Sequence, residues 1–304
     1  ISNKQLSEIP IQKGRAIEIN SDELTFYLSK YKSQITNQYL GGSIFTTAAT
    51  SSIFEINNLF LGSVGKDNNS KFLIDIMNTY PIKTFLNVDP QNTGCCLIFL
   101  TPDKERTMAA CPGASGQLTL ANFTETEDFD YIFSDLYSLN SVINKKTISH
   151  LLSSNKGLIL SLSDISVMKK HMDFIKKYSD QIKIIAGNED EMKYLEQAMN
   201  TSLISASKKN NKLYIVTKGS SGSLILHKGI EYVSEAIPTE VTSLNGAGDT
   251  FLGAFIGCYM ETKDIQYSGN VANYFSYVSV QENNACLKFS NLIKTKNAAK
   301  AAFL

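Results

Sequence analysis

The second half of the chain alternates regularly between short apolar runs and segments with a helical spacing of apolar residues. Such alternation builds a parallel sheet with helices on both faces, so the sequence predicts an α/β fold. Ligands of these sheets bind beyond the carboxyl ends of the strands, where we expect the functional site. The predicted strands are 131–133, 158–162, 183–186 and 213–217, and the predicted helices between them are 143–152, 165–178 and 189–199.

A β-hairpin interrupts this alternation in the first half of the chain. Apolar strands at 93–100 and 106–110 flank a turn at Pro102 and Asp103, which suggests a small β lid on an α/β body. Since no linker or repeat is visible, 1–304 is predicted to be one domain, with the lid formed by segments near 8–45 and 92–116. The other predicted elements are helices at 21–31, 43–56, 70–80, 270–281 and 295–303, a strand at 58–64 and a hairpin near 223–233.

The composition bounds the class of protein. Of 304 residues, 43% are hydrophobic, which is enough for a substantial core. Twenty-nine basic and 29 acidic residues leave no net charge, which argues against nucleic acid or an anionic membrane as partner. No run reaches transmembrane length, and the five cysteines form no CxxC pair. The sequence therefore predicts a cytoplasmic protein with reduced thiols.

A glycine-rich turn at 241–256 carries the strongest chemical signal. Gly246, Ala247 and Gly248 open an apolar helix, and their backbone amides suit a phosphate-sized anion at its positive end. Asp249 follows, where a carboxylate can accept a proton from an attacking hydroxyl. These residues are equally compatible with a tight turn in which Asp249 caps the helix.

Two common nucleotide signatures are absent from the sequence. The segment 62–67 has neither the spacing nor the hydroxyl of a Walker loop, and Phe251 stands where a dinucleotide fingerprint needs its third glycine. Any nucleotide must be held by other means.

The stretch 245–255 resembles the C-terminal signature of the ribokinase-like (PfkB) family of carbohydrate and nucleoside kinases. Motifs at 41–43, 62–67, 188–191 and 217–222 occur in the family's order and spacing, so the resemblance covers nearly the whole chain. The hairpin segments 93–94, 101–108 and 112–115 are similar to the lid of the bacterial adenosine-kinase-like branch. The resemblance implies a ribokinase-like three-layer α/β/α sandwich with a mostly parallel central sheet and a small β lid.

The resemblance also implies catalytic roles. Asp249 would be the general base, and Gly246, Ala247 and Gly248 would form the anion hole for the transferring γ-phosphoryl group. A magnesium ion would ride on the nucleotide phosphates, with Asn188 and Glu191 acting largely through its waters. Without the resemblance, that last pair also fits a helix cap followed by an exposed acid in the first turn.

The nucleotide site implied by the resemblance involves residues from three regions. Thr217, Gly219 and Gly222 would line the ATP site, and Asn273 matches a position near the nucleotide base. As an isolated Asn in a helix, Asn273 would otherwise be assigned to the surface. The remaining implied ATP-site residues are Lys218 and Asn245.

On the acceptor side, Gly41 and Gly42 would let the backbone approach the sugar, with Ser43 beside them. Asp135 falls where relatives place a Glu that reaches the active site, although a loop carboxylate at a strand end is an equal alternative. Arg106 in the hairpin would close on substrate or phosphate, the alternative being a solvated side chain.

The sequence departs from the family pattern at several positions. Ser243, Leu244 and Asn284 differ where many relatives build a monovalent-cation site, so potassium activation is in doubt. Thr46 stands where an Asn usually binds the acceptor, and Cys96 replaces an Arg of the adenosine-kinase-like branch. Relatives open with a strand bearing an acceptor-binding Asp, which 1–15 does not resemble; we expect either a missing segment or degenerate acceptor recognition.

The sequence thus predicts an ATP- and magnesium-dependent kinase acting on a primary hydroxyl of a small sugar or nucleoside. Adenosine-like nucleosides are favoured because of the lid motifs, and ribose- or fructose-type sugars come next. The alternative is a catalytically weak sugar- or nucleoside-binding protein that keeps the kinase fold. The expected partner is a small molecule, and the expected state is a monomer or a homodimer formed through the lid.

Overall fold

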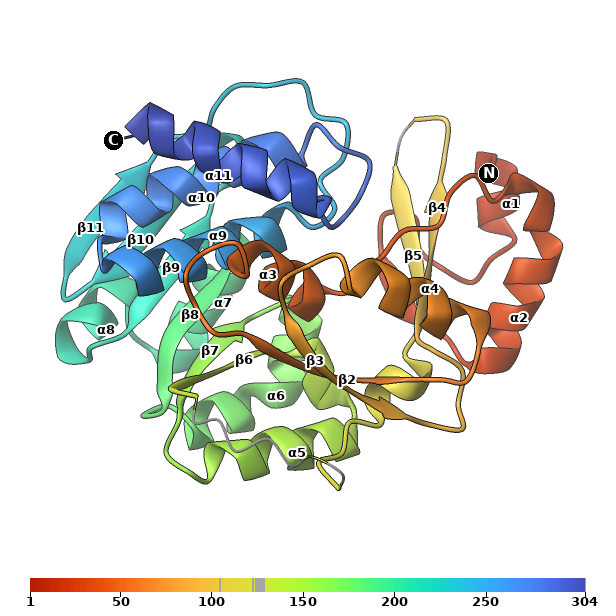
Figure 1. The fold of residues 1–304 in the computed structure, drawn as a ribbon, viewed down its shortest axis with the longest axis horizontal. Coiled ribbons are helices and arrows are strands. Elements are labelled where there is room, and N and C mark those ends of the chain that lie inside the picture. The colour runs from red at the N-terminus through yellow and green to blue at the C-terminus, as the bar shows by residue number, and fades with distance from the viewer. Residues whose placement is uncertain (104, 122, 124–128, 304) are drawn as a thin grey trace. The chain divides into compact units, whose positions relative to one another are not determined.

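The computed structural model describes residues 1–103, 105–121, 123 and 129–303 (Figure 1). Lys104, part of the hairpin motif, lies outside this description. Contacts divide the chain into two compact units. The smaller unit comprises Ile1–Gln38, Leu61–Asp75 and Thr84–Phe123, and the larger comprises Tyr39–Phe60, Ile76–Lys83 and Thr124–Leu304.

The larger unit is built on a six-stranded sheet with the order β11-β10-β9-β8-β7-β6. The first four strands in chain order are parallel, and the last two are antiparallel additions at one edge. This confirms the predicted α/β fold with a mostly parallel sheet. The strands are β6 (Tyr131–Asp135), β7 (Gly157–Ser161), β8 (Ile182–Asn188), β9 (Leu213–Thr217), β10 (Ser223–His227) and β11 (Ile230–Ser234).

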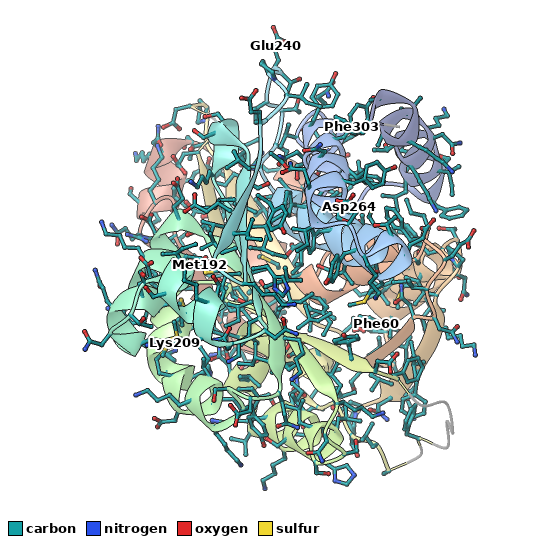
Figure 2. All side chains as sticks on the ribbon, turned by 90° about the vertical axis from the view of Figure 1, so that its left-hand side faces the viewer. Phe60, Met192, Lys209, Glu240, Asp264 and Phe303 are labelled. Atoms are coloured by element: carbon teal, nitrogen blue, oxygen red, sulfur yellow. The ribbon has the colours of Figure 1, made fainter. Side chains whose placement is uncertain are left out.

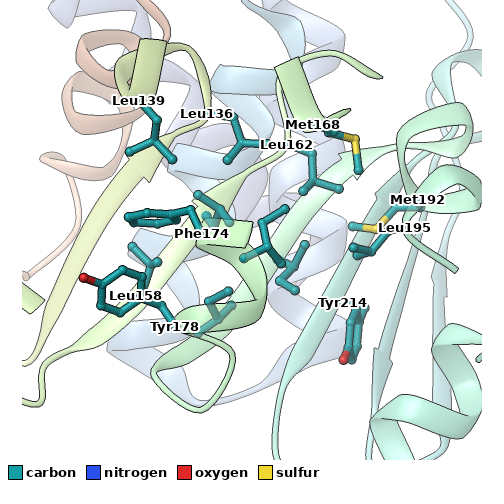
Figure 3. Packing of buried hydrophobic residues seen from close by; sticks show 14 of the residues in the cluster. Leu136, Leu139, Leu158, Leu162, Met168, Phe174, Tyr178, Met192, Leu195 and Tyr214 are labelled. Carbon is teal, nitrogen blue, oxygen red and sulfur yellow. The ribbon is translucent and has the colours of Figure 1, made fainter. Parts of the chain in front are cut away.

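One face of this sheet packs against four helices. Side chains of both layers form a continuous buried cluster that includes Leu158, Phe174, Met192 and Tyr214 (Figure 3). Strands covered in this way read as nearly unbroken apolar runs, which is why the sequence located them well. The helices are α5 (Val142–Leu152), α6 (Ile165–Lys177), α7 (Glu189–Met199) and α8 (Leu203–Lys209).

The opposite face carries the helix that follows the glycine-rich turn. That helix, α9 (Ala247–Thr262), packs between α3 (Ser43–Ser51) and α10 (Ile265–Ser279). In turn α10 packs on β10 and β11, and α11 (Phe289–Phe303) packs on α10. The larger unit therefore has the three layers that the family resemblance implies.

The smaller unit contains a three-stranded sheet with the order β1-β5-β4. The hairpin strands pair antiparallel, as the sequence predicts, and β1 adds to β5 in parallel. Helices α1 and α2 cover one face with a buried cluster that contains Tyr27, Phe99 and Ala109. The elements are α1 (Asn3–Ser7), β1 (Ala16–Glu18), α2 (Ser21–Lys30), β4 (Cys95–Leu100) and β5 (Arg106–Cys111).

Several boundaries differ from the sequence-based expectation. Helix α3 ends at Ser51 rather than near Ile56, and α10 and α11 each begin several residues early. Strand β3 (Lys83–Val88), which pairs with β2 (Leu59–Val64), was not predicted because polar residues interrupt its apolar pattern. Helices α1 and α8 were also missed, and α4 (Asn68–Met77) is shifted toward the N-terminus. None of the helices within the described ranges is long and apolar enough to cross a membrane.

Candidate active site

Polar side chains stand at the carboxyl ends of all four parallel strands. Asp135 ends β6, Asp164 follows β7, Asn188 ends β8 and Thr217 ends β9. Because these strands run in the same direction, their carboxyl ends meet at one edge of the sheet. The structure thus places three of the predicted site residues along one edge and adds Asp164, which the sequence analysis did not single out.

The glycine-rich turn ends at the N-terminus of α9. Gly246 is the N-cap residue with a left-handed φ of 73°, and a β-carbon on it would overlap the carbonyl oxygen of Ala285. Asp249 lies inside the first turn, so the alternative in which it caps the helix is wrong. The first amides of a helix have no intrahelical acceptor, and Gly248 is exposed with open space beside it. This terminus can therefore receive an anion.

The Asp249 carboxylate is held from the neighbouring helix. Ser43 Oγ donates a hydrogen bond of 2.5 Å to Asp249 Oδ1, and Thr47 Oγ1 donates one of 3.1 Å to the Asp249 carbonyl. Burial raises the pKa of the Asp249 carboxyl, the hydrogen bond from Ser43 opposes the rise, and the charge of Asp135 adds to it. A carboxylate with a raised pKa is a better proton acceptor than an ordinary surface aspartate.

Four carboxyl groups act on one exposed phenol, that of Tyr137. The pKa of Tyr137 is raised to about 12, chiefly because its hydroxyl is buried. The negative charges of four acids add to this rise: Asp164, Glu191, Asp135 and Asp249. The side chain as a whole is 46% exposed. The acids at the ends of β6 and β7 and in the first turns of α7 and α9 therefore lie near one partly exposed phenol. Sequence reasoning missed Tyr137, whose only local signal is its position two residues after Asp135.

Asn188 and Glu191 form a capping box at the start of α7. Asn188 Nδ2 and N donate to the two oxygens of Glu191 at 2.8 and 3.0 Å, and Glu191 N donates to Asn188 Oδ1 at 2.9 Å. The structure thus confirms the helix-cap interpretation. The expected exposure of the acid is wrong, because Glu191 is only 7% exposed. Burial raises the pKa of its carboxyl.

Asn188, Glu191 and the neighbouring acids do not enclose a bare metal ion. Within the described residues, no group of three or more His, Cys, Asp or Glu side chains is arranged to hold one. Each oxygen of the Glu191 carboxylate already accepts one hydrogen bond and has a lone pair left for a water. These residues fit a magnesium ion that keeps its waters and rides on a nucleotide, the mode that this ion favours.

The turn after β9 requires its glycines. Gly219 and Gly222 have φ of 53° and 81°, and a β-carbon on Gly222 would overlap the carbonyl oxygen of Ser234. Lys218 N donates to Gly222 O at 2.8 Å and closes the turn. Thr217 Oγ1 donates to Gly187 O at 3.4 Å, so its side chain lies over β8. The predicted ATP-site residues of this segment share one compact turn.

A pocket of about 310 Å³ lies beside Asn273. The side chain of Asn273 is buried, and its Nδ2 donates to Ser234 O at 2.8 Å, so the expectation of an ordinary surface Asn is wrong. Figure 2 shows Phe303, another lining residue, near the end of α11, and Glu240 at the outer tip of the connection between β11 and α9. The lining residues are Glu235, Ala236, Ile237, Pro238, Asn270, Asn273 and Phe303.

The predicted acceptor residues of the larger unit lie at the start of α3 and the end of β6. Gly41 and Gly42 are exposed with open space beside both, and Gly42 has a φ of 104° that favours glycine. Asp135 is 4% exposed and accepts hydrogen bonds from Ser138 N and Oγ at 2.8 and 2.7 Å. Burial raises the pKa of its carboxyl. Arg106 belongs to the smaller unit, and its role stays a prediction.

The two segments that depart from the family's cation-site pattern do meet. Ser243 N donates to Val280 O at 3.0 Å, and Asn245 N donates to Ser243 Oγ at 3.2 Å. Ala285, next to Asn284, contacts Gly246 as described above. The substituted residues therefore border the glycine-rich turn itself, and the doubt about potassium activation stays a prediction.

A parallel sheet with acids at its strand ends, and a glycine turn opening a helix beside a carboxylate, define an α/β phosphotransferase. The chain belongs to the pfkB family of carbohydrate kinases, whose family model matches residues 15–291. It is thus a carbohydrate or nucleoside kinase.

Individual relatives agree with this class. The chain is 25% identical over 256 residues to adenosine kinase of Dictyostelium discoideum, covering 76% of this chain and 75% of the relative. A probable sugar kinase from Rhizobium etli has a similar structure, with a TM-score of 0.82, 19% identity and coverage of 100% and 94%. Adenosine kinase from Sinorhizobium meliloti gives a TM-score of 0.81 at 18% identity, with coverage of 97% and 94%. The ribokinase-like fold is thereby confirmed.

Proposed function

We propose that this kinase transfers the γ-phosphoryl group of ATP to a primary hydroxyl of a nucleoside, with adenosine-like nucleosides favoured. The observation that carries the proposal is the Asp249 carboxylate, partly buried and hydrogen-bonded, in the first turn of α9 beside the amides of Gly246, Ala247 and Gly248. The similarity to an adenosine kinase supports the nucleoside, and the similarity to a probable sugar kinase makes a ribose- or fructose-type sugar the second candidate.

In this proposal Asp249 accepts the proton of the acceptor hydroxyl as its oxygen attacks the γ-phosphorus. The bond between that phosphorus and the β–γ bridging oxygen breaks, and ADP leaves. The amides at the N-terminus of α9 stabilise the charge on the transferring phosphoryl oxygens, because they point at the anion before the reaction begins. Phosphoryl transfer depends mainly on such positioning and charge.

The nucleotide is proposed to lie along the ends of β8 and β9 and in the pocket beside Asn273. The turn containing Thr217, Lys218, Gly219 and Gly222 brings backbone close to the phosphates, and Asn245 stands at the start of the anion-hole turn. A magnesium ion on the phosphates would supply neutralising charge, held through its waters by Asn188 and Glu191. The pocket volume falls at the lower end of the range for small-molecule sites, which suits a planar base.

The acceptor is proposed to contact Gly41, Gly42, Ser43 and Asp135. The smaller unit would act as a lid that contributes Arg106, either within a monomer or in a homodimer. Closure of such a lid excludes water and so prevents hydrolysis of ATP in place of transfer.

An ADP-release assay over adenosine, inosine, ribose and fructose, with and without potassium, tests the proposal. Asp249→Ala should lower kcat by several decades, because the base contributes only in the transition state, while ATP binding should be retained. The retained ATP affinity also reports that the variant is folded. Near-normal turnover by Asp249→Ala would exclude the base assignment. Binding of ATP without Asp249-dependent turnover of any acceptor would favour a binding protein.

A further inference from the structure

Helix α3 presents two hydroxyl groups to a single residue of α9. Ser43 and Thr47 are four positions apart and therefore lie on one face of the helix. Ser43 donates a hydrogen bond of 2.5 Å to the carboxylate of Asp249, and Thr47 donates one of 3.1 Å to its backbone carbonyl. Gly253, one turn further along α9, allows the close approach, since a β-carbon there would lie 2.5 Å from Thr47 O. The two helices are thus locked at the residue proposed as the base.

We propose that Ser43 is a positioning residue for Asp249: its hydroxyl occupies Oδ1 and leaves Oδ2 to accept the proton of the acceptor. This inference rests on the proposed function and goes beyond the expectation that Ser43 merely borders the sugar. A carboxylate bonded at one oxygen has one preferred rotation, so the second oxygen points in one direction.

Ser43 also sets the charge state of the base. The titratable groups that face Asp249 are Asp135 from the end of β6, Tyr137 from the following turn and Cys286 from the connection between α10 and α11. Of these, ionised Asp135 opposes a negative charge on Asp249, whereas the pKa values of about 12 for Tyr137 and about 11 for Cys286 keep those two groups neutral on the acid limb. The donated hydrogen bond of Ser43 favours that charge and counteracts burial, since a bond to the ionised form lowers a carboxyl pKa. Ser43 thereby keeps the base ionised at a lower pH.

The dependence of kcat/KM on pH tests the inference, because it reports ionisations of the free enzyme. Ser43→Ala should move the acid limb upward by about one pH unit, as expected for loss of a hydrogen bond to a charged group. On the plateau kcat should fall roughly tenfold, with little change in the KM of ATP. Ser43→Thr, which keeps a hydroxyl group, should return the acid limb of kcat/KM to its wild-type pH. Thr47→Val, which loses only the bond to the backbone carbonyl, should keep the wild-type limb.

A readout without turnover complements the kinetics. In protein labelled with ¹³C at aspartate carboxyls, the signal absent from Asp249→Asn identifies Asp249, and its titration midpoint should rise in Ser43→Ala but not in Thr47→Val. Equal midpoints and superposed acid limbs in Ser43→Ala and wild type would overturn the inference. If Asp249→Ala keeps its turnover, the proposed function fails instead, whatever the midpoints show.

Discussion

The carbonyl oxygen of Ala285 packs directly against the α-carbon of Gly246, in the place that a β-carbon would occupy. Gly246 belongs to the glycine-rich turn before α9, and Ala285 belongs to the connection between α10 and α11. Gly246 also has the left-handed φ of 73°, which side chains disfavour. The start of α9 is therefore fixed by a contact between segments far apart in sequence.

Substitution of Gly246 should cost far more stability than the same substitution of Gly248. Gly246→Ala adds backbone strain and an overlap of the new β-carbon with the Ala285 carbonyl oxygen. We therefore expect a loss of about 2–4 kcal/mol in the free energy of unfolding. Gly248→Ala enters open space within a helix and should gain roughly 0.5–1 kcal/mol. Denaturant titration measures both values. Equal stability of the two variants would refute the role of the Ala285 contact.

Neutralising Asp249 should stabilise the protein while abolishing turnover. The pKa of this carboxyl is raised in the fold above the ordinary value of 3.8, chiefly by burial. The folded state therefore binds the proton more tightly than the unfolded state, and ionisation costs stability once pH exceeds the folded pKa. Asp249→Asn should raise Tm at pH 7. The difference in Tm between variant and wild type should shrink as pH falls through the raised pKa and should vanish below 3.8. A lower Tm at pH 7 would contradict the prediction.

Glu191→Gln should distinguish a magnesium role from a purely capping role. Gln preserves the capping box but removes the charge. We expect a Tm at pH 7 no lower than that of wild type, because burial raises the pKa of the Glu191 carboxyl and the neutral amide avoids that cost. The magnesium concentration for half-maximal activity should rise roughly tenfold, because one carboxylate proposed to face the ion's waters is lost. Glu191→Ala, the control, should also lose about 1 kcal/mol of stability with the cap. An unchanged magnesium requirement in both variants would leave the residue as a helix cap.

Asn270 and Asn273 line the same pocket and should differ in their effect on stability. Asn273→Ala leaves the carbonyls of Ser234 and Glu235 without their buried donor and should cost about 1–3 kcal/mol. Asn270→Ala should cost little, because its bond to Gln266 is partly exposed. If the pocket holds the nucleotide base, both changes raise the KM of ATP more than they lower kcat. An unchanged KM in both variants would place the base elsewhere.

Local periodicity made much of the larger unit predictable. The four parallel strands and their helices lie within a few residues of their predicted bounds. A buried strand needs an apolar run, and an amphipathic helix needs apolar residues along one face, so both leave a local pattern in the sequence. The prediction failed at β3 and α8, where polar residues interrupt the pattern and neighbouring elements decide the conformation. For Asn188 and Glu191, the alternative of a helix cap with an exposed acid was right about the cap and wrong about the exposure, because burial depends on what packs above a helix end.

The residues 245–249 by themselves predicted a glycine-rich turn that opens a helix, because glycine freedom and helix polarity are local properties. They left an anion site and a turn capped by the acid equally open. Tertiary structure alone decided how that acid is held. Ser43 and Asp249 stand 206 positions apart, and only the packing of α3 against α9 brings the hydroxyl to the carboxylate. The parallel order of β6, β7 and β8 likewise brings Asp135, Asp164 and Glu191 near Tyr137. Charge and hydrogen bonding act through space, so the pKa of a base is a property of the assembled fold.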